Sequence, residues 1–325
     1  MNVICRALGV GIVLAVLVTA LHVDAQTAPY PSKPVRIIVP YPPGGASDIT
    51  ARVVADKLTQ MWKQSVIVDN RPGATGILGT DLVAKAAPDG YTLGLVASSQ
   101  AINAVVNTKL PYDTLKDFSY ITETASVPLV LVAASGFPAT TATELIALAK
   151  KEPGRISYAS SGPGGAPHLA AELFKSSTGT DMLHVPYKGS TQAHPDLLSG
   201  QVGIMFDTIV AVMPHLKSGR LKALATTGKT RSTLLPDVAA VAETVPGYEA
   251  SSWGGIIGPA GIPEEVVRKI NADIVATLKT PEVKERLAQL GADVVANSPA
   301  EFAQVIRLEI DKWGKVVRAA GVKAE

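Results

Sequence analysis

The chain has 325 residues, of which 47% are hydrophobic and 18% charged, and its formal net charge is only +2. A chain of this length buries a large core and accommodates one large domain or two of ordinary size. The charge balance lacks the basic signature of nucleic-acid binding, so we predict no nucleic-acid partner.

The first residues have the pattern of a secretory signal peptide. Arg6 gives a short positive start, residues 7–23 are apolar, and a small-residue cleavage site ends at Ala25. We therefore expect residues 1–25 to be removed, with a retained membrane anchor as the alternative. The single cysteine, Cys5, lies inside this segment, so the mature chain is expected to have no disulfide and no thiol chemistry.

Apolar, strand-like runs alternate with helical patterns along almost the whole chain. The eight runs cover residues 35–39, 65–68, 92–96, 129–133, 156–159, 202–206, 221–226 and 252–257. Apolar residues at helical spacing lie between them, as in Ile49, Val53 and Leu58. This alternation predicts an α/β fold with largely parallel, buried sheets.

Helix signals and two changes of pattern predict the organisation. Thr141 and Glu144 form one capping box, and Ser298 and Glu301 form another with Pro299 at the first helical position. Zones near residues 122–127 and 247–252 look like crossings between domains. We expect one discontinuous lobe of residues 26–127 plus 247–325, and a second lobe of residues 128–246.

Four glycine- or serine-rich turns each follow an apolar run and precede a helical pattern. They span residues 42–48, 71–80, 97–100 and 159–169. In open α/β sheets, ligands bind in such loops, where helix N-termini supply N–H donors and a partial positive charge. The pattern suits a carboxylate ligand, although each turn alone is also an ordinary βα connection.

Two further positions follow strand-like runs. Tyr187 is placed to stack on a ligand or hydrogen-bond it, and Lys188 to offset an acid; the alternative is that both belong to a solvated loop. Asp207 is placed to accept from a ligand amine or hydroxyl, or to cap the next helix.

Catalytic and metal-binding motifs are absent from the sequence. It has no G-x-S-x-G elbow, no H-E-x-x-H, no phosphate loop, and no metal-ligand spacing among its histidines. A triad of Ser161, His168 and Asp207 leaves a secreted serine hydrolase as a minor alternative. We otherwise expect no enzyme activity, no metal and no cofactor.

The motifs taken together resemble one family. "PSKPVRIIVPYPPGGASDITARVVADKL", "VDNRPGATGILGTDLVAKAAPDGYTLGLV", "GPGGAPHLAAELFKSSTG" and "HVPYKGS" are similar to the Bug family, the periplasmic receptors of tripartite tricarboxylate transporters. The resemblance implies a type II periplasmic-binding-protein fold, with two α/β lobes around a ligand cleft. It also implies a receptor that does no chemistry and binds a small carboxylate.

The resemblance also implies site residues from both lobes. The ligand carboxylate would lie against residues 42–48 and 73–76, and residues 160–168 with Tyr187 would close from the other lobe. The expected ligand-binding residues are Tyr41, Gly44, Gly45, Ser47, Asp48, Thr75, Gly76, Ser98, Ser99, Ser161, Gly165, His168, Tyr187 and Asp207. The chain departs from the family pattern at Gln192 and His194, where relatives mostly carry small or apolar residues.

The sequence therefore predicts a monomeric periplasmic receptor that presents its ligand to the membrane subunits of a tripartite tricarboxylate-type transporter. The alternative receptor role is signalling to a sensor kinase without import. Which carboxylate is bound stays open. It also stays open whether Asp48 and Asp207 contact the ligand or cap helices.

Overall fold

The computed structural model describes residues 30–107, 109–162, 165–187 and 189–320. The predicted signal peptide, Cys5 and Lys188 therefore lie outside the described residues. A compact unit begins at Lys33 and contains all the strands and helices discussed below.

The first group of strands forms sheet A, in the order β2-β1-β3-β9-β4. β1 (Val35–Val39) pairs in parallel with β2 (Val66–Asn70) and β3 (Thr92–Ala97). β9 (Ser251–Pro259) is antiparallel to β3, and the short β10 (Asp293–Val294) pairs with β4. Val35, Ile37, Ile38 and Val39 of β1 are fully buried and Arg36 is exposed, which explains why the run is apolar apart from that one residue.

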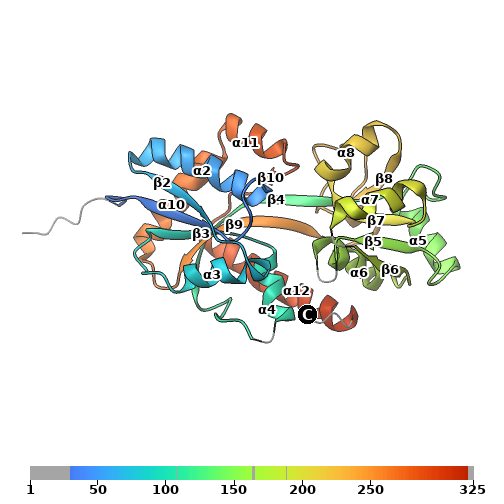
Figure 1. Ribbon diagram of the computed structural model, residues 1–325, viewed down its shortest axis with the longest axis horizontal. Helices are drawn as coiled ribbons and strands as arrows, with labels where there is room; N and C mark the ends of the chain where they lie inside the picture. The colour runs from blue at the N-terminus through green and yellow to red at the C-terminus, as the bar shows by residue number, and fades with distance from the viewer. Residues whose placement is uncertain (1–29, 108, 163–164, 188, 321–325) are drawn as a thin grey trace, which may run out of the picture. The chain divides into compact units, whose positions relative to one another are not determined.

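Helices cover this sheet. They are α2 (Ala46–Trp62), α3 (Ile77–Ala84), α4 (Ser99–Val106), α10 (Glu264–Leu278), α11 (Pro281–Ala288) and α12 (Pro299–Ala320), with a 3-10 turn at Ala74–Gly76. α2 packs on α10, and α4 packs on α12 (Figure 1). In the chain, the carboxyl end of β1 is followed by the start of α2, and that of β3 by the start of α4.

The second group forms sheet B around β7 (Ile204–Thr208), β5 (Ser157–Ser160) and β6 (Leu183–Pro186), with β8 (Leu221–Thr226) paired to β4. β5 is parallel to both β6 and β7. Its helices are α5 (Ala142–Lys151), α6 (Ala166–Thr178), α7 (Ser190–Ser199), α8 (Ile209–Lys217) and α9 (Val241–Thr244).

One long strand joins the two sheets. β4 (Phe118–Ala134) pairs with β9 as far as Pro128, opposite Ser251, and then with β7 from Leu129 onward (Figure 1). Residues 122–127, where the first crossing zone was expected, are part of this strand. The expectation of largely parallel sheets is wrong for the centre, because β4 and β9 pair antiparallel with all their neighbours. The predicted lobe limits themselves stay a prediction.

The terminal helix packs against both halves of the core. Phe302 and Ile306, near its start, belong to the apolar cluster of sheet A. Trp313, Val316 and Val317, near its end, belong to the cluster that contains the sheet B helices, and α12 contacts α6. α12 therefore links the cores of the two sheets alongside the β4 crossing.

Both predicted capping boxes mark helix starts. Ser298 accepts from the Glu301 N–H at 3.3 Å, and the Glu301 carboxylate accepts from the Ser298 N–H at 2.8 Å. Thr141 likewise accepts from the Glu144 N–H at 3.2 Å. The Glu144 carboxylate, however, reaches back to the N–H of Thr140 instead of Thr141.

Gly255 in β9 provides a test of the packing between the crossing strands and α12. A methyl group at this position would lie 2.1 Å from ring atom Cζ of Phe302, which is fully buried. We expect Gly255→Ala to lower the free energy of unfolding by about 2 kcal/mol in urea titrations, because the ring has no room to move. Adding Phe302→Leu should recover part of that loss.

Gly136→Ala is the matched control, because a methyl group there meets no atom within 4 Å and Gly136 is exposed. A Gly255→Ala protein that unfolds at the same urea concentration as this control would contradict the packing described here.

Candidate functional site

The loop after β1 turns sharply into α2. Gly44 has φ +85°, a left-handed conformation that glycine adopts without steric penalty. Gly45 then precedes the first residue of α2, and no side chain caps the helix start. Both glycines are exposed, and Ser47 in the first turn is half-buried. The first N–H groups of α2 are thus left to an outside acceptor.

Asp48 holds this loop in place. Its side chain is 3% exposed and accepts hydrogen bonds from the Gly44 N–H at 2.9 Å and from Asn70 Nδ2 at 2.9 Å. Arg52, one turn further along α2, donates to the same carboxylate at 3.0 Å. Burial alone would raise the pKa of Asp48, but these donors outweigh it and lower the pKa to about 2.

Tyr41 ties the same loop to the end of β3. Its hydroxyl accepts from the Ala97 N–H at 3.0 Å and lies 2.7 Å from Ser99 Oγ. Burial raises the pKa of this tyrosine above its ordinary value. Asn70 also donates to the Tyr41 carbonyl oxygen. The loop, β2 and the start of α4 are therefore fastened to one another.

Residues 73–76 form the next wall in an unusual conformation. Four consecutive residues have positive φ: Gly73 (145°), Ala74 (47°), Thr75 (53°) and Gly76 (91°). Left-handed conformations cost residues with a Cβ roughly 1–2 kcal/mol each, so surrounding contacts must hold them. Asn103 of α4 donates to the Thr75 carbonyl oxygen at 3.1 Å, and a Cβ at Gly76 would lie 3.3 Å from the Tyr41 ring and 3.5 Å from Pro40.

Ser98 connects this group to β9. It is buried, its Oγ lies 3.2 Å from Ser252 Oγ of β9, and its N–H donates to the Trp253 carbonyl oxygen. A small recess opens beside these residues and is lined by Ser47, Thr124 and Ser252, among others. The structure thus brings together all nine predicted residues that precede residue 100.

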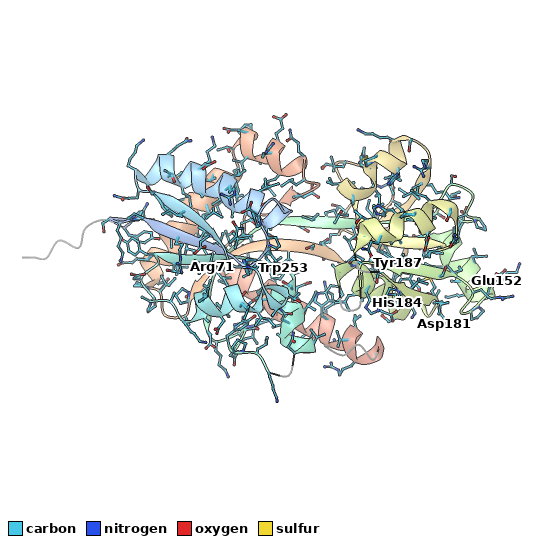
Figure 2. The ribbon with its side chains drawn as sticks, in the orientation of Figure 1. Arg71, Glu152, Asp181, His184, Tyr187 and Trp253 are labelled. Carbon is cyan, nitrogen blue, oxygen red and sulfur yellow. The ribbon has the colours of Figure 1, made fainter. Side chains whose placement is uncertain are left out.

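A second group lies at the carboxyl ends of β5 and β6. The Tyr187 N–H donates to the Ser160 carbonyl oxygen at 3.0 Å, and Ser160 Oγ lies 2.7 Å from His184 Nε2. Ser161 is half-buried, and its Oγ lies 3.2 Å from the point where a Cβ on Gly165 would stand. Figure 2 shows His184 and Tyr187 at this end of sheet B.

His168 belongs to a stack of three rings. Its ring centroid is 4.0 Å from that of His184, which in turn lies 4.9 Å from Tyr158. Burial, together with the neighbouring His184, lowers the pKa of His168 to about 4. Burial also lowers the pKa of His184. Both imidazoles are therefore neutral near pH 7 and supply polar but uncharged edges.

Tyr187 and Asp207 each have a partner that the sequence did not suggest. The Tyr187 hydroxyl donates to Asp196 at 2.6 Å, and burial followed by that carboxylate raises its pKa to about 12. Asp207 is 2% exposed and accepts from Ser190 and from His194. The signal for His194 was its departure from the family pattern, but its partner was not predictable from the sequence.

The suggested triad is not assembled. Asp207 Oδ1 accepts from Ser190 Oγ and the Thr208 N–H, and Oδ2 pairs with His194 Nε2 at 2.8 Å, so His194 stands where a triad would need His168. Within the described ranges, no group of three acidic, histidine or cysteine side chains is arranged to hold a metal ion. In the same part of the chain, no helix combines the length and apolarity that crossing a membrane requires.

The helices that begin after the predicted loops and beside Asp207 share one property. α2, α4, α6, α7 and α8 begin without a side-chain cap, as α10 and α11 also do, whereas α5 and α12 are capped by Thr141 and Ser298. Uncapped N-termini present N–H donors and partial positive charge to whatever lies before them. This arrangement suits anionic groups of a small ligand.

Comparisons with known proteins agree with this description. Residues 50–322 match the model of the tripartite tricarboxylate transporter family receptor. The periplasmic binding protein BugD is 33% identical, with a TM-score of 0.71 over 91% of this chain and 100% of its own.

Two further structures contain carboxylates. An R. palustris protein solved with adipate is 34% identical, with a TM-score of 0.74 over 90% of this chain and 99% of its own. MatC from Rhodopseudomonas palustris, with bound malate, is 31% identical, with a TM-score of 0.70 over 89% of this chain and 100% of its own. The predicted periplasmic-binding-protein fold with two α/β lobes is confirmed by these neighbours.

Proposed function

Because this chain belongs to the family of tripartite tricarboxylate transporter receptors, we propose that it is a periplasmic receptor for a small organic carboxylate. The ligand would be delivered to the membrane subunits of a tripartite tricarboxylate-type transporter. The receptor would act as a monomer, after removal of residues 1–25, and would do no chemistry on its ligand.

The observation that carries this proposal is the start of α2. Gly44 and Gly45 expose the first N–H groups of an uncapped helix, while Asp48 and Tyr41 hold the loop from behind. A carboxylate at this point would accept from backbone N–H groups at the positive end of the helix. Ser47 in the first turn of α2, and Ser98 and Ser99 at the start of α4, would add hydroxyl donors to the same ligand.

We propose that the sheet B group closes on the same ligand. Ser161, Gly165, His168 and Tyr187 lie at the carboxyl ends of β5 and β6, where α/β folds bind ligands. A ligand that contacts both lobes binds the closed arrangement more tightly than the open one, so it shifts the population toward closure. The adipate and malate of two family members support a carboxylate of four to six carbons as the ligand class.

A thermal-shift screen with succinate, malate, adipate and citrate tests this proposal. Because a ligand that binds only the folded state stabilises it by mass action, a hundredfold excess over the Kd should add about 2.7 kcal/mol. We therefore expect the melting temperature to rise by several degrees with at least one of these acids.

The matched diamides, succinamide and adipamide, serve as controls because they keep the carbon skeleton and remove the charge. A melting temperature unchanged by all four acids, or raised equally by the diamides, would contradict a carboxylate receptor.

A further inference from the structure

A buried carboxylate at the end of β7 bears on which carboxylates are accepted. Asp207 Oδ1 accepts from Ser190 Oγ at 3.0 Å and from the Thr208 N–H at 2.8 Å. Asp207 Oδ2 lies 2.8 Å from His194 Nε2. Only 2% of the residue is exposed. Both oxygens are therefore engaged by donors from this chain.

Two of these donors come from one face of α7. Ser190 and His194 are four residues apart, so successive turns of the helix place them one above the other. A carboxylate only accepts hydrogen bonds, so Nε2 of His194 carries the hydrogen. His194 is 8% exposed, and its ring packs edge-on against His215 at 5.5 Å, which fixes its position.

The register of sheet B places this carboxylate beside the proposed ligand residues. Ala159 of β5 is paired with Met205 of β7. Because the two strands are parallel, the same register places Ser161 opposite Asp207, two residues later on each strand. Ser160 is paired with Pro186, so Ser161 is also level with Tyr187. Asp207 therefore lies in the same row of strand ends as two residues of the proposed site.

An accessible carboxylate in this row would be the natural acceptor for the ammonium group of an amino acid. Here that carboxylate is already satisfied, and the other acid nearby, Asp196, accepts from the Tyr187 hydroxyl. An ammonium group that is desolvated without an acceptor is strongly disfavoured. Discrimination of this kind arises from the contact that is missing for the wrong ligand.

We propose that His194, with Ser190, closes Asp207 to cationic groups, so that the receptor selects carboxylates that lack an α-ammonium group over the matching amino acids. This inference rests on the proposed function of the same site. His194 is in this view a positioning residue that acts through Asp207.

Calorimetric titration with two matched pairs of ligands tests the inference. Succinate and aspartate differ only by the ammonium group, as do adipate and 2-aminoadipate. For whichever pair binds, we expect the wild-type protein to bind the plain diacid at least tenfold more tightly. His194→Ala should reduce that ratio at least tenfold by uncovering Asp207, whereas His194→Gln, which retains an N–H donor, should keep the ratio within threefold.

Gln192→Ala is the matched control, because Gln192 is exposed on the same turn of α7. Ser190→Ala, expected to reduce the ratio more weakly, serves as the second variant should His194→Ala not fold. A wild-type protein that binds aspartate as tightly as succinate would overturn the inference, as would an unchanged ratio in folded His194→Ala. If none of the proteins bound either pair, and malate and citrate also left the melting temperature unchanged, the proposed function would be overturned, and this inference with it.

Discussion

Replacing Asp48 with alanine is expected to lower the free energy of unfolding by about 3 kcal/mol and to weaken carboxylate binding at least tenfold. The substitution removes one carboxylate and leaves the Gly44 N–H and the Asn70 amide without their acceptor. Arg52 loses its partner too, but it is half exposed and water replaces much of that contact. Binding suffers because the loop no longer holds the first N–H groups of α2 in place.

The same residue predicts acid sensitivity with a definite sign. Burial raises the pKa of Asp48, but the hydrogen bonds from Arg52, Gly44 and Asn70 lower it to about 2, below its ordinary value near 3.8. A group with a depressed folded-state pKa stabilises the fold above its unfolded pKa and loses that contribution as the pH falls. We therefore expect about 2 kcal/mol of wild-type stability to disappear between about pH 4 and pH 2.

Urea titrations at pH 7, 4 and 2.5 measure both effects, and calorimetry with the acid found in the screen measures binding. Asp56→Ala is the matched control, because Asp56 lies two turns along the same helix and is exposed, so its loss should change stability by less than about 0.5 kcal/mol. If Asp48→Ala matched this control in stability at pH 7, Asp48 would not be the tie described here.

The sequence predicted the peripheral strands and helices better than the centre of the fold. β1 and β8 were predicted at their observed limits, because alternation of buried strands and amphipathic helices is a local signal. The first half of β4 was missed because its polar Thr122, Glu123 and Thr124 hide a strand whose burial comes from β9 and α12. Its antiparallel pairing depends on segments more than 100 residues away, which no local pattern records.

For the site, the sequence predicted positions but not partners. The glycines at 44, 45 and 76 were recognisable because turns that need positive φ or close approach favour glycine. The contact of Tyr41 with Ser99 spans 58 residues, and that of Asp48 with Asn70 spans 22, so both depend on how the strands pair. The open question about Asp48 is answered in part: its carboxylate binds the Gly44 N–H, and any ligand contact would have to add to that.

At His194, too, the sequence indicated the position but not the partner. Its departure from the family pattern was visible, yet nothing in the sequence indicated that it meets Asp207 across a helix–strand contact. At the start of α8, Asp207 accepts the N–H of Thr208, the residue that precedes the helix, whereas the Thr208 side chain makes no capping hydrogen bond. Pro195 lies inside α7, which is continuous from Ser190 to Ser199.

A second large effect is expected at Glu123, which lies in the part of β4 that pairs with β9 in sheet A. It is 7% exposed, and Asn297 donates to its carboxyl at 3.3 Å. Burial, followed by the nearby Glu309 and Glu249, raises its pKa to about 7. Glu309 does not lower the pKa of Glu123 by donating a hydrogen bond to it, because the Glu309 carboxylate itself accepts from Trp253, Trp313 and Lys312.

The sign at Glu123 is opposite to that at Asp48. Between about pH 4.5 and 7 the folded chain retains a proton that the unfolded chain has released, so the free energy of unfolding falls as the pH rises through this window. The expected loss is about 3 kcal/mol. Glu123→Gln cannot ionise and retains an acceptor for Asn297, so its stability relative to wild type should increase by this amount from pH 4 to pH 8.

Urea titrations at several pH values between 4 and 8 check this. Glu265→Gln, an exposed position on α10, should run parallel to wild type across the whole range. Because Asp48 titrates well below this range, any divergence between Glu123→Gln and wild type reports on the crossing strand alone. Parallel curves for Glu123→Gln and wild type would mean that Glu123 is already ionised at pH 4.5 in the folded protein, and that the crossing strand tolerates a buried charge.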